Sequence, residues 1–137
     1  MRCLKFLLIF AFAMPAWGGL EQSLRERAEA YWKAVEANDL VTQYKMEATA
    51  KEGKLTPEAF RARAEGRFRY ENVKVVDVKV EGDKGVVTVR ADERIPKWGV
   101  VRKNRIIKDP WIRIDGVWYH RIPSMESALQ GLLGKKK

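Results

Sequence analysis

The sequence predicts an α+β fold in which N-terminal helices pack on a strongly curved antiparallel sheet. Apolar residues recur every three or four positions from Leu20 to Val35, which is the spacing of one buried helix face. Further along, Val76, Val78 and Val80 alternate with charged residues, as in a half-buried antiparallel strand. Helices therefore come first along the chain and strands second, an order that is typical of the α+β class.

Three helices are expected before the strands. The first should end near Asn38. Asp39 can cap a second, shorter helix, whose apolar face would carry Leu40, Val41, Tyr44 and Ala48. Thr56 supplies an N-cap hydroxyl for a third helix, and Pro57 supplies a first helical residue with its φ preset. Gly66 offers this helix a natural end.

Three strand regions follow the helices. The alternation slips between Val75 and Val76, which indicates either a β-bulge or a strand buried on both faces. The second strand should end before Pro96, which cannot donate to a ladder. The third, over residues 105–115, contains Pro110, and this suits a bulge or a sheet edge.

Asp115 and Gly116 predict a two-residue hairpin, because both residue types accept the positive φ of a type I′ turn. One side of this hairpin is expected to face the core, and it carries Ile112, Ile114, Val117 and Tyr119. The other side is amphipathic and large, and we expect a homodimer mate or the chain itself to cover it; it carries Trp111, Arg113, Trp118 and His120.

Residues 1–18 are typical of a secretory signal, with basic residues, an apolar run over residues 6–14 and small residues before the cut. The expected cut lies between Gly18 and Gly19, with an earlier one after Ala13 as the alternative. The apolar run is shorter than the roughly 20 residues that a spanning helix needs. The sequence therefore predicts export, either to the periplasm or by full secretion.

Residues 19–123 should form a single domain, followed over residues 124–137 by a short helix or a basic tail. Cys3 is the only cysteine and would leave with the signal, so the core must form without disulfides. The net charge of +9 favours contact with polyanions, although it also serves solubility. Export makes an anionic component of the cell envelope a better expected partner than nucleic acid.

The chain resembles the nuclear transport factor 2-like superfamily, which includes SnoaL-like cyclases and ketosteroid isomerase. The resemblance covers residues 20–122 and rests on the Tyr31–Trp32 pair, the corner at Asn38 and Asp39, and the hairpin over residues 111–119. It implies a cystatin-like cone, in which helices close over a strongly curved sheet and the mouth holds a small ligand. Many exported members are simple domains.

An isomerase or cyclase of this superfamily would need a carboxylate base, a tyrosine and a protonated acid in an apolar pocket. Tyr31 or Tyr44 could supply the tyrosine. The candidate acids are Asp39, Asp77 and Asp92. However, a helix cap explains Asp39 better, and a solvent-facing strand position explains Asp77.

His120 is the only histidine, and no metal-ligand spacing surrounds it, so we predict neither a metal site nor a cofactor. It could act as a general base, but its place beside Trp118 on a hairpin favours a structural role. The sequence contains no nucleophile elbow and no glycine-rich phosphate loop. No catalytic residue is therefore predicted.

Two groups of residues are candidates for binding. Four aromatic side chains are expected in a ligand pocket or in the core: Tyr31, Trp32, Tyr44 and Phe60. A cationic cluster that includes tryptophans suits an anionic surface, and its members are Arg94, Lys97, Trp98, Arg102, Lys103, Arg105, Lys108 and Trp111. The alternative for this cluster is a solvated strand edge after an irregular segment over residues 97–103.

The function expected from these patterns is that of an exported, non-catalytic domain that binds a small apolar ligand or an envelope partner. A small-molecule isomerase or cyclase is the first alternative. A basic module that binds anionic lipid or polymer is the second alternative.

Overall fold

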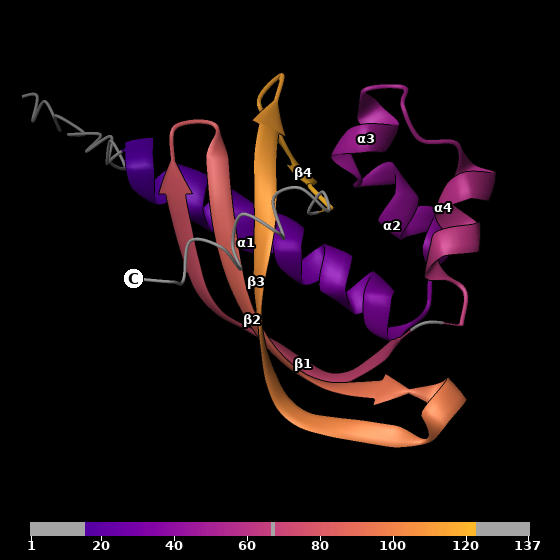
Figure 1. Ribbon diagram of the computed structural model, residues 1–137. Coiled ribbons are helices and arrows are strands. Elements are labelled where there is room, and N and C mark those ends of the chain that lie inside the picture. The colour runs from indigo at the N-terminus through magenta and orange to yellow at the C-terminus, as the bar shows by residue number, and fades with distance from the viewer. Residues whose placement is uncertain (1–15, 67, 123–137) are drawn as a thin grey trace, which may run out of the picture.

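The computed structural model describes residues 16–66 and 68–122, and Figure 1 shows their arrangement. The expected C-terminal helix or tail over residues 124–137 lies outside this part, as does the expected signal sequence apart from its last three residues. The helices are α1 (Ala16–Glu36), α2 (Leu40–Lys45), α3 (Ala48–Lys51), α4 (Pro57–Ala64) and a 3₁₀ turn, η1 (Pro96–Trp98). The strands are β1 (Arg69–Glu81), β2 (Lys84–Ile95), β3 (Val100–Ile114) and β4 (Val117–His120). Among the described residues, no helix has the length and apolar character needed to cross a membrane.

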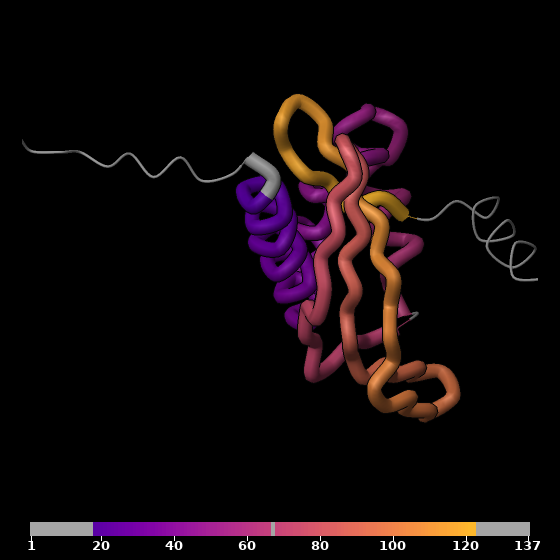
Figure 2. The backbone as a smooth tube through the Cα atoms, turned by 90° about the vertical axis from the view of Figure 1, so that its left-hand side faces the viewer, coloured from indigo at the N-terminus to yellow at the C-terminus, as the bar shows by residue number. Residues whose placement is uncertain are grey.

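The strands form one antiparallel meander in the order β1-β2-β3-β4, so the predicted α+β fold is confirmed. The sheet is strongly curved, α1 lies along one of its faces, and α2, α3 and α4 gather beside β4 (Figures 1 and 2). Register shifts occur in β1 between Val75 and Asp77 and in β2 between Ala91 and Glu93. The slip at Val75 is therefore a β-bulge, which bends a strand more sharply than regular pairing allows.

Two helix starts form through the predicted caps. Asp39 accepts a hydrogen bond from the Thr42 backbone N–H at 3.1 Å, at the start of α2. Thr56 accepts one from the Ala59 backbone N–H at 3.2 Å, at the start of α4. Both side chains satisfy amides that a helix cannot pair internally.

The predicted second helix is wrong in its extent, because it breaks into α2 and α3 at Met46 and Glu47. Glu47 has an extended backbone and forms a bridge with His120 at the end of β4. The His120 N–H donates to the Met46 carbonyl at 2.8 Å. The helix stops here because Glu47 pairs with a strand residue more than 70 positions away in the chain. The periodicity of the local sequence contains no information about such a distant partner.

The β3–β4 hairpin has the predicted register, with Ile114 opposite Val117. Its two sides are the reverse of the prediction. Trp111 and Trp118 are 2% exposed, whereas Val117 is 40% exposed. The side that was expected to need covering is therefore the core side.

Helix α1 covers this side of the hairpin. Ser23 accepts a hydrogen bond from Trp118 Nε1, and Arg27 donates to the Trp118 carbonyl. Helix α1 of the same chain therefore buries this side of the hairpin. Its buried residues Trp111, Trp118 and His120 are not available as a dimer face. A homodimer stays a prediction, but the hairpin side that was expected to form its interface is buried inside the domain.

The basic segment over residues 97–103 is also more regular than predicted. After η1, strand β3 begins at Val100, which pairs with Ile95, and continues without a break through Lys103. Cross-strand pairing of residues 100–102 with β2 orders this part of the strand, and the sequence of the segment shows no alternation that would predict it.

Candidate functional site

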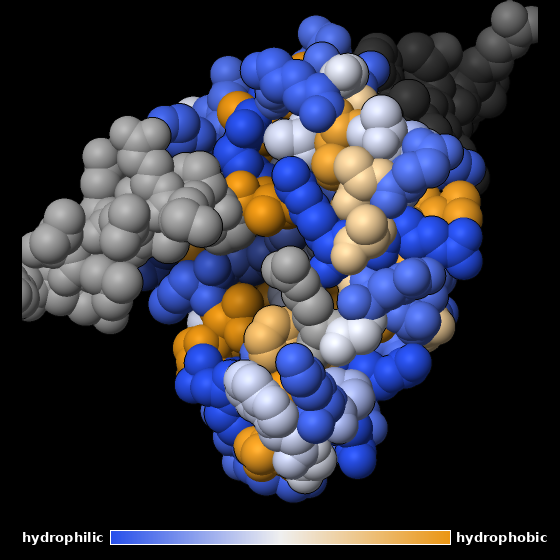
Figure 3. Space-filling model, turned by 45° about the vertical axis from the view of Figure 1, so that its right-hand side comes forward, coloured by the Kyte–Doolittle hydropathy of each residue, from blue (hydrophilic) through white to orange (hydrophobic). Residues whose placement is uncertain are grey.

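A cavity of about 400 Å³ opens between the helices and the inner face of the sheet. Apolar side chains emerge among hydrophilic ones on this side of the molecule (Figure 3). The cavity is lined mainly by aromatic and aliphatic residues from α1, α2, α4, β1 and β3, among them Tyr31, Trp32, Val35, Leu40, Phe60, Ala64, Phe68, Tyr70, Ile107, Pro110 and Ile122. Such a lining favours the binding of an apolar molecule.

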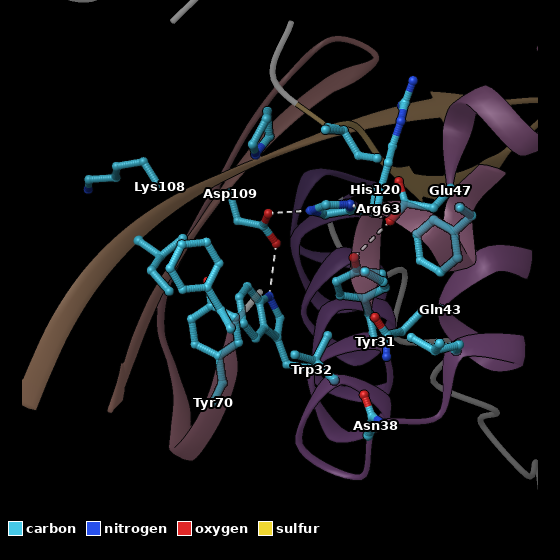
Figure 4. Close-up of a pocket in the computed structure, with 18 residues that line it drawn as sticks. Tyr31, Trp32, Asn38, Gln43, Glu47, Arg63, Tyr70, Lys108, Asp109 and His120 are labelled. Carbon is cyan, nitrogen blue, oxygen red and sulfur yellow. Dashed lines mark hydrogen bonds and ion pairs between the residues drawn. The ribbon is translucent and has the colours of Figure 1, made fainter. Parts of the chain in front are cut away.

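One wall of the cavity contains a buried ionic cluster of Glu47, Asp109 and His120 (Figure 4). His120 Nδ1 lies 2.8 Å from Glu47 Oε1, and His120 Nε2 lies 2.5 Å from Asp109 Oδ1. The three side chains come from the end of β4, from β3 and from the link between α2 and α3. Glu47 is fully buried, and Asp109 is 4% exposed.

Aromatic side chains complete the hydrogen bonds of this cluster. Asp109 Oδ2 accepts from Trp32 Nε1 and from Trp111 Nε1, each at 2.9 Å. The Tyr31 hydroxyl donates to Glu47 Oε1 at 2.7 Å, and its ring stacks on the His120 imidazole with centroids 4.3 Å apart. In the described part of the chain only Glu47 Oε2 within the cluster lacks a partner.

The cluster shifts the pKa values of its members. Burial lowers the pKa of His120, but the neighbouring carboxylates of Asp109 and Glu47 outweigh it and raise this pKa to about 10. His120 is therefore an imidazolium at neutral pH. Burial, together with the Glu47 carboxylate, raises the pKa of the Tyr31 hydroxyl well above its ordinary value.

This arrangement limits the chemistry that the cluster can perform. A general base needs a free lone pair, whereas both His120 nitrogens carry protons that they donate to carboxylates. Both Asp109 oxygens already accept hydrogen bonds. Only Glu47 Oε2 has acceptor capacity to spare, and it lies behind other side chains of the wall.

Three of the four predicted pocket aromatics, Tyr31, Trp32 and Phe60, line the cavity. Tyr44 is not among its lining residues. Its hydroxyl donates to the Leu55 carbonyl at 2.7 Å, and its ring packs against Phe60, so it supports the wall from behind.

The predicted surface cluster is exposed apart from one member. Its six cationic residues and Trp98 are all exposed. Trp111 is buried, because its indole N–H reaches Asp109 and its ring packs edge-on against Tyr31. The structure therefore removes Trp111 from the surface group.

Sequence reasoning missed Glu47 and Asp109. Glu47 lies within a helical pattern, and Asp109 precedes a proline in a strand of uncertain bounds. No local motif marks either residue, because their roles come from contacts with His120 across 73 and 11 positions. Within residues 16–66 and 68–122, no group of three His, Cys, Asp or Glu side chains is arranged to hold a metal ion.

Comparison with solved structures shows the fold. An LEH-like epoxide hydrolase from M. tuberculosis aligns with a TM-score of 0.50 at 15% identity, over 84% of this chain and 96% of that one. A SEC-C motif containing protein from Rhodopseudomonas palustris aligns with a TM-score of 0.50 at 16% identity, over 66% of this chain and 69% of that one. A protein of unknown function with a cystatin-like fold from Nostoc punctiforme aligns with a TM-score of 0.46 at 14% identity, over 82% of this chain and 96% of that one.

No family model matches the sequence. No curated protein matches it either. At these identities a structural likeness shows the fold alone. The chain therefore shares with the two structures that align at a TM-score of 0.50 a fold in which N-terminal helices pack on a curved antiparallel sheet.

Proposed function

We propose that this chain is an exported, non-catalytic domain that binds a small apolar molecule in the cavity between α1, α4 and the sheet. The observation that supports this most directly is the lining of the cavity, where aromatic and aliphatic side chains predominate. Its volume of about 400 Å³ lies at the small end of the roughly 300 to 1,000 Å³ of typical ligand pockets. The ligand should therefore be small.

The polar residues around the cavity suggest how such a ligand would be oriented. Asn38 and Arg63 line the cavity and are exposed, so they lie towards its mouth. Tyr31, Trp32 and Phe60 are buried and lie deeper. An apolar body would therefore enter first, and a polar end would stay near Arg63.

The buried cluster supports binding rather than catalysis. Its hydrogen bonds hold α1, β3, β4 and the α2–α3 link at fixed distances, which keeps the cavity preformed. Because His120 is protonated and donates from both nitrogens, it cannot take a proton from a substrate.

The test uses 1-anilinonaphthalene-8-sulfonate, a fluorescent probe with an apolar body and an anionic end. Ala64 lines the cavity at the end of α4, and Ala62 lies on the same helix but is exposed. Ala64→Trp should fill the cavity and weaken saturable probe binding at least tenfold, or about 1.4 kcal/mol. Ala62→Trp adds the same ring outside the cavity and should leave the affinity unchanged. Equal affinities for both variants would show that the probe does not use the cavity.

A catalytic use of the same cavity is the second candidate, and the unpartnered Glu47 Oε2 favours it. A positioned carboxylate oxygen in an apolar cavity is what a general base for an isomerase, a cyclase or an epoxide-opening enzyme requires. Glu47 is fully buried, however, so a substrate could reach it only after wall side chains move. That requirement places this candidate second.

Styrene oxide, a small apolar epoxide, tests the second candidate. A base at Glu47 would take a proton from water as the water oxygen attacks one ring carbon and the bond from that carbon to the ring oxygen breaks. The alkoxide formed would take a proton from solvent, and Glu47 would return its proton to solvent, so that the product is the diol. Diol formation by the wild-type chain that disappears in Glu47→Gln, with folding verified by circular dichroism, would favour catalysis. Probe binding without diol formation is the outcome expected for a binding domain.

A further inference from the structure

The hairpin formed by β2 and β3 projects beyond the rest of the domain and ends at the turn η1 (Figures 1 and 2). We call residues 94–106 of this hairpin the β2–β3 tip. Gly99 closes the turn with a left-handed φ of 61°, and its N–H donates to the Pro96 carbonyl. None of residues 94–106 is among the residues that line the cavity, so an inference about the tip does not depend on the proposed ligand.

The tip exposes large apolar side chains. Trp98 is 70% exposed at the turn, and Ile106 is 56% exposed. Val100 and Val101 are 43% and 37% exposed. In the space-filling view the lower lobe, which contains the tip, is mostly hydrophilic with an apolar patch (Figure 3). Exposed apolar side chains on a projecting element, surrounded by polar ones, are typical of an interaction surface.

The same tip is strongly cationic. Residues 94–106 contain five lysines and arginines and no acidic residue. Three of the cations form ion pairs with acidic residues at the base of the hairpin: Arg94 with Glu71, Arg102 with Glu93 and Lys103 with Asp92. In the described part of the chain, Lys97 and Arg105 have no ion-pair partner. Their charge remains available to an external anionic surface.

Asp92 holds the base of the tip in a fixed bend. It accepts hydrogen bonds from the Asn104 backbone N–H and from the Asn72 side chain, both at 2.9 Å. These bonds, with a further one from Lys103, lower the pKa of Asp92. Asp92 therefore links β1, β2 and β3 where the sheet bends. These hydrogen bonds fix the direction in which the tip projects.

We propose that the β2–β3 tip docks on an anionic lipid bilayer. Lysine and arginine are attracted to the negative surface of such a bilayer, and tryptophan partitions to the level of its headgroups. Nucleic acid would also attract the cations, but it gives no reason for exposed valine and isoleucine beside them. The projecting turn combines a tryptophan, aliphatic side chains and two cations that have no ion-pair partner among residues 16–66 and 68–122, and this combination fits a lipid surface.

The test measures co-sedimentation of the full chain with vesicles of phosphatidylcholine, with and without phosphatidylglycerol. Lys97→Glu combined with Arg105→Glu should lower partitioning to the anionic vesicles at least about tenfold, since each cation near such a surface contributes roughly a fivefold factor. The matched control is Lys79→Glu combined with Lys84→Glu, which changes the charge equally on exposed residues near the other end of β2. This control variant should bind the anionic vesicles more strongly than the variant with Lys97→Glu and Arg105→Glu.

Trp98→Ala separates a bilayer from a soluble polyanion. It should lower partitioning to the anionic vesicles about tenfold, whereas Val41→Ala, at another exposed apolar position in the domain, should not. All variants keep residues 1–18, the expected signal sequence, so any contribution from that segment is the same in each. Equal effects of the two charge variants, or full vesicle binding by Trp98→Ala, would overturn the proposal. Wild-type binding to heparin but not to vesicles would overturn it in favour of a soluble polyanion.

Discussion

His120 Nδ1 lies 2.8 Å from Glu47 Oε1, although the two residues are 73 positions apart in the chain. The contact joins the last residue of β4 to the link between α2 and α3, and the backbone bridge between the same residues fixes it. Through Asp109, His120 also connects to α1, because Trp32 donates to the same carboxylate. The wall of the cavity and the packing of the domain therefore depend on the same few side chains.

The protonation of His120 predicts that the domain loses stability at alkaline pH. The pKa of His120 rises from an ordinary value of 6.5 to about 10 in the folded protein. A raised pKa contributes stability that is complete below the unfolded value and is lost as the pH rises through the folded value. The free energy of unfolding should thus fall by on the order of a few kcal/mol between about pH 6.5 and about pH 10. Urea denaturation across this interval measures it, and a constant value would contradict the assignment.

Asp109→Asn should destabilise the domain by about 3 kcal/mol, because it leaves a buried imidazolium with one carboxylate instead of two. An NH2 group, which donates, also replaces one of the two accepting oxygens, so the asparagine cannot accept all the hydrogen bonds from His120, Trp32 and Trp111. Asp115→Asn is the matched control, since it makes the same chemical change at an exposed turn residue with φ 50° that asparagine tolerates. Urea denaturation should separate the two variants clearly, and equal stabilities would show that the cluster is not important for folding.

Tyr31→Phe should lower the free energy of unfolding by about 1 to 2 kcal/mol, because it removes the hydroxyl that donates to buried Glu47. The stacking of the ring on His120 is retained. Tyr119→Phe, on the half-buried side of β4, provides the comparison and should change stability little. Thermal unfolding of the two variants tests this prediction. If Tyr31→Phe is as stable as the wild type, the hydrogen bond from the Tyr31 hydroxyl to Glu47 makes no net contribution to stability.

Gly85→Ala should destabilise the packing of α1 on β2 by about 1 to 3 kcal/mol. A Cβ atom at this position would overlap Leu24 Cδ2 and lie 3.4 Å from Trp118 Cζ3, and Leu24 is fully buried. Gly19→Ala, in the first turns of α1 with open space around it, is the control and should be neutral or slightly stabilising. Chemical denaturation of both variants tests this, and a neutral Gly85→Ala would show that Leu24 moves aside freely.

Several features of the fold were predictable because their causes are local. The caps at Asp39 and Thr56 depend on a side chain three residues from the amide that it satisfies. The hairpin at Asp115 and Gly116 depends on residues that accept positive φ, and it fixes the register of β3 against β4. The charge and exposure of the tip likewise follow from a run of sequence without acids.

The candidate site was only partly predictable. Tyr31, Trp32 and Phe60 were expected in a pocket or in the core, and the structure places all three on the wall of the cavity. Glu47 and Asp109 could not be found in this way, since a glutamate in a helical pattern or an aspartate before a proline is usually a surface residue. Only their convergence on His120 distinguishes them.

The order of helices and strands along the chain thus predicted the fold class. The caps, the hairpin register and the positive charge of residues 94–106 were also predictable, because each depends on residues that are close together in the chain. The tertiary structure decided which side of the β3–β4 hairpin is core, where the second helix breaks, and which carboxylates surround His120. Alternation along a strand shows that its two faces differ, but the helix that covers one of them decides which becomes the core. Here α1 covers Trp111 and Trp118, and their burial brings His120 between Asp109 and Glu47.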